Sequence, residues 1–253
     1  MILDLQKASL LKRASAFLLD AILLVVLATG FFYIISGVTG YEQHRLIVAE
    51  ATERISQEYG VTTEMTSKSF DKLTEDEIAA INAADKALQE DEAACRAYVM
   101  VANLSTLIVS LGLLLAFVLL EFVVPLLFGN GQTLGKKIFG IAVMHIQGVK
   151  LGHVALFVRT VLGKYAVETM PLALSALYLI SGLGSPVFLL IGAALLIVQL
   201  IVVIVSHENA LLHDKMAVTV TVDLASQMIF DTYDQLLEYK KKMHAEKAAS
   251  QAY

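Results

Sequence analysis

The sequence predicts an all-α membrane protein with four transmembrane helices, an extracytoplasmic helical insert and a small cytoplasmic β element. Of its 253 residues, 57% are hydrophobic, whereas soluble domains contain about 45–50% apolar residues. The excess is concentrated in blocks long enough to cross a hydrocarbon core, which takes about 20 helical residues. Two short segments instead carry the alternating pattern of strands. Together these patterns indicate a polytopic helical protein in a lipid bilayer.

Residues 1–38 are expected to form an interfacial lead-in followed by the first transmembrane helix. Lys12 and Arg13 stand at the entrance of the apolar run, and Asp20 lies inside it. A basic start to an apolar run also occurs in signal peptides, but here Asp20 interrupts the run and no Ala-x-Ala cleavage site follows it. We therefore interpret this segment as an uncleaved anchor.

Residues 40–97, called the insert below, are acidic, with 13 acidic and 6 basic residues. Ile47, Ala51 and Ile55 recur at a four-residue spacing, which is typical of a helix. A second helix is expected to open at residues 74–77, because the sequence TEDE is a capping-box pattern. With no Gly or Pro before the next apolar block, this helix is expected to run continuously into the membrane. The insert is then either a solvated helical segment or a coiled coil that binds a partner.

Residues 99–223 are expected to supply the remaining spans and the β element. The spans are predicted at residues 99–128, 154–181 and 187–205. Strand patterns occur at residues 139–146 and at residues 218–222.

A turn sequence, Gln147-Gly148, follows the first strand pattern and also suits a short hairpin. Residues 224–253 are expected to form a cytoplasmic tail helix, with apolar side chains along one side at Ile229, Tyr233, Leu236 and Leu237.

The predicted orientation follows from the basic residues of the short loops, which favour the cytoplasm. The loop at residues 129–153 contains Lys136, Lys137 and Lys150 and no acidic residue. The N-terminus and the tail are basic as well. We therefore expect a multi-pass protein of the cell membrane with both termini in the cytoplasm. The acidity is confined to the insert, so a nucleic-acid partner is not expected.

Several ionisable residues fall inside the predicted spans, where they are costly unless they are paired or functional. Asp20 lies in the first span, and Glu121 lies at a similar depth in the second. Lys164 and Glu168 are expected to form an i,i+4 pair on the third helix. Since all of these groups fall in the cytoplasmic half of the membrane, we expect one polar cluster around Asp20. Asp214 reaches it from the end of the fourth span.

Asp20 needs a partner from elsewhere in the chain. Arg13 is seven residues away, about 10.5 Å along the helix axis, which is too far for a direct ion pair. The candidate partners within the cluster are Arg13, Glu121, Lys164 and Asp214. Two interpretations remain open: an ion-pair network that locks the helices together, or a cation or proton site with Asp20 and Glu121 as ligands or proton carriers.

Two catalytic motifs are excluded by their spacing. Residues 129–136 suggest a phosphate loop, but the spacing is one residue too long and Lys137 stands where Ser or Thr is required. His207-Glu208 suggests a zinc protease, but the next histidine is His213, and six residues do not place two rings on one helix face. We therefore expect no enzyme activity, no cofactor and no metal site.

Three sequence features together resemble the RDD family, which is named for an arginine and two aspartates. The first is the spacing of Arg13 and Asp20 at the start of a membrane helix. The second is the loop GQTLGKK at residues 131–137, which contains Gly131, Gln132, Thr133, Gly135 and Lys136. The third is LHDK at residues 212–215, so that Asp214 corresponds to the second aspartate.

The resemblance covers residues 8–38 and 99–223, and leaves out the insert and the tail. Val218 stands where members often have glycine. The family implies an integral membrane fold and a transport role with no defined substrate.

We therefore expect a transporter-like protein that moves cations or protons through the cluster around Asp20. The alternative is a non-transporting accessory or scaffold subunit that binds partners through the insert or the C-terminal helix. Assembly as a homo-oligomer or with a membrane-complex partner stays open.

Overall fold

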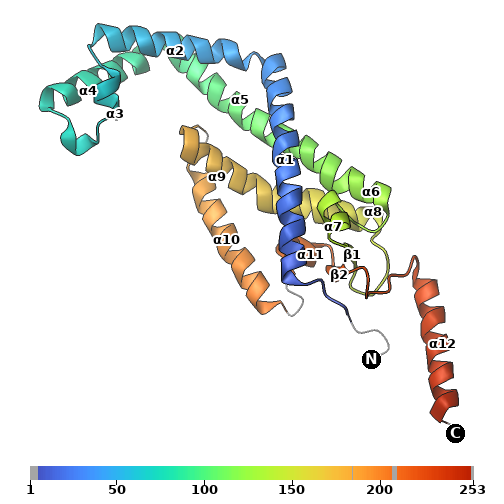
Figure 1. Ribbon diagram of the computed structural model, residues 1–253. Coiled ribbons are helices and arrows are strands. Elements are labelled where there is room, and N and C mark those ends of the chain that lie inside the picture. The colour runs from blue at the N-terminus through green and yellow to red at the C-terminus, as the bar shows by residue number, and fades with distance from the viewer. Residues whose placement is uncertain (1–4, 184, 207–209, 252–253) are drawn as a thin grey trace.

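The computed structural model describes residues 5–183, 185–206 and 210–251. Most of this chain is helical, with one small sheet at the end of the molecule where α1 begins (Figure 1). The predicted combination of long apolar helices and a small β element is therefore confirmed.

Helix α1 (Leu10–Thr39) begins at Ser9, whose hydroxyl accepts a hydrogen bond from the amide of Lys12. It ends at Gly40, which adopts a left-handed conformation with φ 71°. Glycine reaches this region without a steric penalty, so the chain turns sharply there. Helix α2 (Tyr41–Glu58) begins directly after the turn and lies along α5.

The insert is helical, as expected, and consists mainly of α2, α3 (Thr63–Ser67) and α4 (Glu75–Glu90). Thr74 and Glu77 form the predicted capping box at the start of α4. The expectation of one continuous helix into the membrane was wrong. The chain leaves helical geometry at Asp91, whose carboxylate instead accepts hydrogen bonds from the first amides of α5.

The second long helix consists of α5 (Glu92–Phe117), a π-helical turn η2 (Val118–Val123) and α6 (Val124–Phe128). It crosses α1 closely at Gly112, where a Cβ atom would lie 2.3 Å from the ring of Phe32. Close contact through small residues is the usual packing mode between membrane helices, because apolar burial gives little driving force in lipid.

Further along the chain, three segments form one uninterrupted helical stretch. They are α8 (His153–Phe157), the long π-helical segment η3 (Val158–Thr169) and α9 (Met170–Ser181). Helix α10 (Val187–Val205) packs against α9. Gly192 permits this contact, since a Cβ atom there would lie 2.5 Å from the hydroxyl of Ser175.

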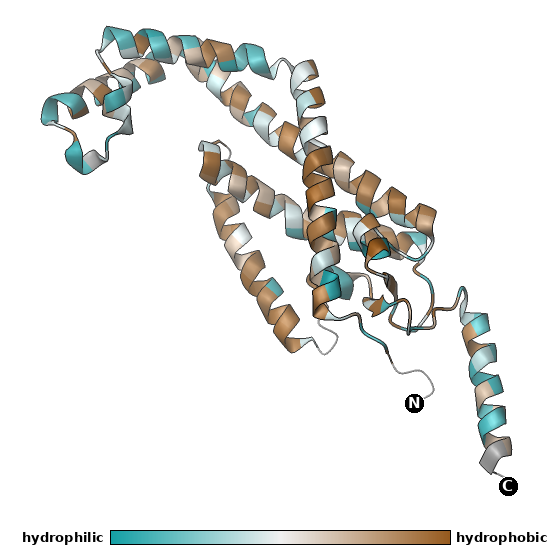
Figure 2. Ribbon diagram, viewed as in Figure 1, coloured by the Kyte–Doolittle hydropathy of each residue, from teal (hydrophilic) through white to brown (hydrophobic). Residues whose placement is uncertain are grey.

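Within the described residues, three helical stretches are long and apolar enough to cross a membrane. They are Leu10–Thr39, Glu92–Phe128 and Val187–Val205, and Figure 2 shows that hydrophobic residues predominate along much of these helices. The third predicted span, at residues 154–181, is helical throughout, but its first half is π-helical and charged. Its crossing of the membrane stays a prediction.

The β element pairs β1 (Ile141–His145) with β2 (Thr219–Asp223) in antiparallel register, with Val143 opposite Thr221. A bridge between Met144 and Lys150 closes the predicted turn. The short helices α7 (Leu134–Ile138) and α11 (Leu212–Met216) precede the two strands and lie on the side of the sheet that faces the long helices (Figure 1). The tail helix α12 (Tyr233–Gln251) extends from the sheet.

Candidate functional site

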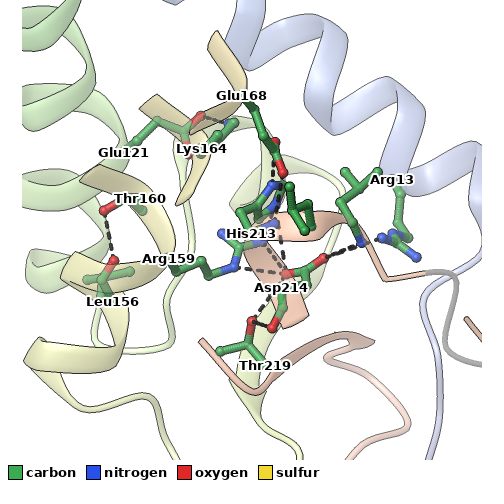
Figure 3. Close-up of polar contacts among 12 residues, drawn as sticks. Arg13, Glu121, Leu156, Arg159, Thr160, Lys164, Glu168, His213, Asp214 and Thr219 are labelled. Atoms are coloured by element: carbon green, nitrogen blue, oxygen red, sulfur yellow. Dashed lines mark hydrogen bonds and ion pairs between the residues drawn. The ribbon is translucent and has the colours of Figure 1, made fainter. Parts of the chain in front are cut away.

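A cavity of about 590 Å³ lies where α1, α7, η3, α10 and α11 meet. Its charged and imidazole side chains come from four of these elements, and α10 contributes mainly leucine and valine. The charged and imidazole side chains at its wall are Arg13, Asp20, Lys136, Arg159, Lys164, Glu168, His213 and Asp214. Figure 3 shows how several of these residues lie around His213 and Asp214.

Asp20 binds the loop that precedes α7. One carboxylate oxygen accepts a hydrogen bond from the hydroxyl of Thr133, and the other accepts one from the amide of Gly135 at 2.7 Å. Thr133 is itself the N-cap of α7, because its hydroxyl accepts a hydrogen bond from the amide of Lys136 at 3.3 Å. Both oxygens of Asp20 are thus used to hold α7 against α1.

The glycines of this loop are needed for close approach. A Cβ atom at Gly135 would lie 2.3 Å from the carbonyl oxygen of Ala16, so α7 could not reach α1 with any other residue there. Gly131 has φ 59°, and a Cβ atom there would lie 3.0 Å from the carbonyl oxygen of Val143. Gln132 connects the same loop to the sheet through a 2.9 Å hydrogen bond to the carbonyl oxygen of Ile141.

Asp214 forms the second polar centre. One of its oxygens accepts hydrogen bonds from Arg159, from Nε at 3.0 Å and Nη2 at 2.8 Å, and from the hydroxyl of Thr219 at 3.1 Å. The other oxygen faces Nη2 of Arg13 at 3.9 Å. Burial, the largest single effect, raises the pKa of Asp214, but the charge and hydrogen bonds of Arg159 together with the other nearby groups lower it further, so the pKa lies below its ordinary value.

His213 connects Asp214's partner Arg159 to Glu168. The backbone amide and Nδ1 of His213 each lie 2.8 Å from an oxygen of Glu168, and Nε2 lies 3.3 Å from Nη2 of Arg159. Because Arg159 can only donate, Nε2 is the accepting nitrogen and Nδ1–H donates to Glu168. Burial lowers the pKa of His213, as does Arg159, so the ring is neutral at pH 7.

Glu121 and Lys164 form the third centre, deeper along the helices, where η2 and η3 lie against each other. One oxygen of Glu121 forms an ion pair with Lys164. The other, Oε2, is the one buried side-chain oxygen or nitrogen of the described chain that has no hydrogen-bond partner. Both residues lie in π-helical segments, which occur frequently at functional sites.

The sequence model of the RDD family matches residues 7–218. The chain belongs to the RDD family. No curated protein and no solved structure matches it. The three motif residues of this RDD protein make two separate sets of contacts. Arg13 faces Asp214 where α1 meets α11, and Asp20 accepts hydrogen bonds from Thr133 and Gly135 at the start of α7.

The expected polar cluster exists in part. Arg13, Asp20, Lys164, Glu168 and Asp214 all border one cavity. Within the described residues, however, Asp20 forms no ion pair or hydrogen bond with any of its candidate partners, because the loop before α7 occupies its carboxylate.

The predicted i,i+4 pair between Lys164 and Glu168 was wrong. In a π-helical segment, residues i and i+5 are paired, so i+4 no longer lies over i. Lys164 instead binds Glu121, and Glu168 binds His213.

Arg159 was not expected as the central cation of the site. The available signal was its position as a basic residue in a helix that becomes apolar further on. The excluded zinc motif at His207 and Glu208 lies outside the described residues.

Proposed function

We propose that this RDD protein is a membrane transporter that moves protons or a small cation through the polar cavity. The observation that carries this proposal is the free Oε2 of Glu121. Glu121 pairs with Lys164, and the side chain of Lys164 borders the cavity. A carboxylate at membrane depth with an unused oxygen can accept a proton, and such groups mark proton and ion pathways in membrane proteins.

We assign to Glu121 the role of ion ligand or proton carrier that the sequence suggested for Asp20. Asp20 and Asp214 each use both oxygens to hold separate elements together, so a change in their charge would separate those elements. Protonation of Glu121 would instead release only its ion pair with Lys164. The ammonium group would then be free to turn toward Glu168 or the cavity, which couples the charge of Glu121 to the occupancy of the cavity.

The proposed topology includes residues 154–181 as a span, which gives four spans in all and places both termini in the cytoplasm of the cell. The basic loop at residues 129–153 supports this orientation. The cavity then opens at the inner half of the membrane, and the insert projects from the outer side.

The test is ion flux in proteoliposomes that contain purified protein and a pH-sensitive dye. Glu121→Gln should abolish cation-dependent proton flux while the protein keeps its thermal stability and oligomeric state. Glu92→Gln, at the exposed start of α5, is the matched control and should transport normally. Asp20→Asn should lower stability. If it abolished flux with stability unchanged, the carrier would be Asp20, and this assignment would be wrong.

The alternative is an accessory subunit that binds partners through the insert or α12. It is favoured by a cavity of about 690 Å³ between α12 and the β1 region, lined by Leu5, Met144, Tyr233, Leu236 and Leu237. Replacement of residues 41–94 by a short linker, or truncation before α12, should abolish partner capture if this alternative holds. Unchanged capture by both variants would exclude it.

A further inference from the structure

The cavity around Asp20 has two chemically different walls. The wall formed by α1, α7, η3 and α11 contains all of its charged groups. The wall formed by α10 contains Leu195, Leu196, Gln199 and Val203. A site with charged groups on one side and hydrocarbon on the other suits an amphipathic ligand better than an ion alone.

The depth of the cavity matches one leaflet of a bilayer. Its α1 wall runs from Leu10, the first residue of that helix, to Asp20, about 15 Å along the axis. Its α10 wall runs from Val203, close to the end of that helix, to Leu195, about 12 Å. Half of a hydrocarbon core is about 15 Å thick. The cavity therefore starts at one membrane interface and reaches the bilayer centre.

The cavity can be entered sideways from the lipid. Helix α10 packs against α9, and Gly192 is its one buried residue. Leu196, on the α10 wall of the cavity, is 58% exposed, and Leu10, on the α1 wall, is 73% exposed. In Figure 1, α10 is separated from α1 where it begins beside α9, and the two helices come closer where α10 ends.

The polar wall has two cations without a carboxylate at hydrogen-bond distance. Its side chains include four cations, Arg13, Lys136, Arg159 and Lys164, and three carboxylates, and Lys164 pairs with a fourth carboxylate, Glu121. Within the described residues, the amine of Lys136 forms no ion pair or hydrogen bond, and the carboxylates of Asp20 and Glu121 act on it only at longer range. Arg13 has only the 3.9 Å contact with Asp214. Lys136 and Arg13 therefore border the cavity as cations that a bound anion could contact.

We propose that this cavity binds one anionic phospholipid, with its phosphate on Lys136 and Arg13 and an acyl chain along α10. Ammonium and guanidinium groups form charge-assisted hydrogen bonds with phosphate oxygens, and basic pockets between membrane helices suit anionic lipid headgroups. Lipid binding is measured in detergent without an ion gradient, so its result is independent of the proposed transport of protons or cations.

The test is native mass spectrometry of the full chain in detergent, titrated with phosphatidylglycerol. Phosphatidylcholine with the same acyl chains and soluble glycerol 3-phosphate are the comparison ligands. We expect one tightly bound phosphatidylglycerol, at least tenfold weaker phosphatidylcholine binding, and no retained glycerol 3-phosphate. Retention of glycerol 3-phosphate as tightly as the lipid would overturn the role of the apolar wall.

Lys136→Gln should weaken phosphatidylglycerol binding about tenfold or more, since a hydrogen bond to a charged group is worth about 1.5–3 kcal/mol. Lys137→Gln is the matched control, because the Lys137 amine lies over the Phe128 ring instead of at the cavity. Leu196→Trp should block the cavity, whereas Ile197→Trp, on the neighbouring exposed position, should not. Equal effects within either pair would reduce the binding to nonspecific surface contact and overturn the proposal.

Discussion

Val218 is strained by its backbone conformation, and its replacement by glycine tests the geometry at the end of α11. Its φ of 54° is the one positive value at a non-glycine residue in the described chain. The left-handed region brings Cβ too close to the following carbonyl oxygen and costs about 1–2 kcal/mol, and a β-branched side chain suits it poorly. Half of the Val218 surface is exposed, so little packing offsets this cost.

We expect Val218→Gly to be more stable than Val218→Ala by about 1 kcal/mol. Both substitutions remove the isopropyl group, but only glycine removes Cβ. The relief of about 1–2 kcal/mol is offset in part by the larger entropy of glycine in the unfolded chain, about 0.5–1 kcal/mol. In a chain of this size, 1 kcal/mol shifts the midpoint of thermal unfolding by about 2–4 °C.

The assay is loss of helical circular dichroism on heating in detergent, since the chain contains no tryptophan. Pulse proteolysis supplies a check where heating is irreversible. Val220→Gly is the matched control and should destabilise the protein, because Val220 is buried in the sheet with ordinary strand geometry. An alanine variant at residue 218 as stable as the glycine variant would refute the argument from backbone strain.

Three further predictions concern contacts at α7, α11 and α4. Gly135→Ala should separate α7 from α1, because the new Cβ would lie 2.3 Å from the Ala16 carbonyl oxygen, and should reduce the yield of folded protein in size-exclusion chromatography. Asp214→Asn should cost about 3–5 kcal/mol in chemical unfolding, because it leaves the buried Arg159 without its carboxylate. The hydrogen-exchange protection of the first turn of α4 should fall in acid. Lys68 and the capping box hold the pKa of Glu77 below its ordinary 4.5, so this stabilisation is complete above pH 4.5 and is lost as pH falls through the lowered pKa.

Each of these predictions has a control within the chain. Gly152→Ala should leave the yield unchanged, since no atom lies within 4 Å of its new Cβ. Asp223→Asn, which breaks an ion pair with the half-exposed Lys12, should cost much less stability than Asp214→Asn. Glu77→Gln keeps the capping hydrogen bonds but cannot titrate, so it should remove the pH dependence at α4. A normal yield of Gly135→Ala would contradict the close contact of α7 with α1. Equal losses of stability in Asp214→Asn and Asp223→Asn would contradict the buried pairing of Asp214 with Arg159. An unchanged acid response in Glu77→Gln would contradict the role of Glu77 at the start of α4.

The long apolar helices and the strand pair could be predicted because hydropathy and alternation are local properties of the sequence. The capping box before α4 was equally local. The break at Asp91 was missed because the prediction looked for glycine and proline, although an aspartate also ends one helix when its carboxylate caps the next.

The partners of the charged residues could not be predicted in the same way. Asp20 binds Thr133 and Gly135, more than a hundred residues further on, through a contact that depends on the packing of α7 on α1. The pairing of Lys164 was mistaken because π-helical winding changes which residues lie over one another. A sequence that favours a helix does not show where its winding widens.

The stretch from Glu92 to Phe128 has a mechanical consequence. Its 37 residues form a rod about 55 Å long, which exceeds a hydrocarbon core of about 30 Å. One end lies beside α2 and α4, and the π-helical turn near the other end contains Glu121. A tilt of the insert would therefore be transmitted along this long helix to the ion pair between Glu121 and Lys164. We expect the helix to bend at the π-helical turn η2, where its backbone is wider.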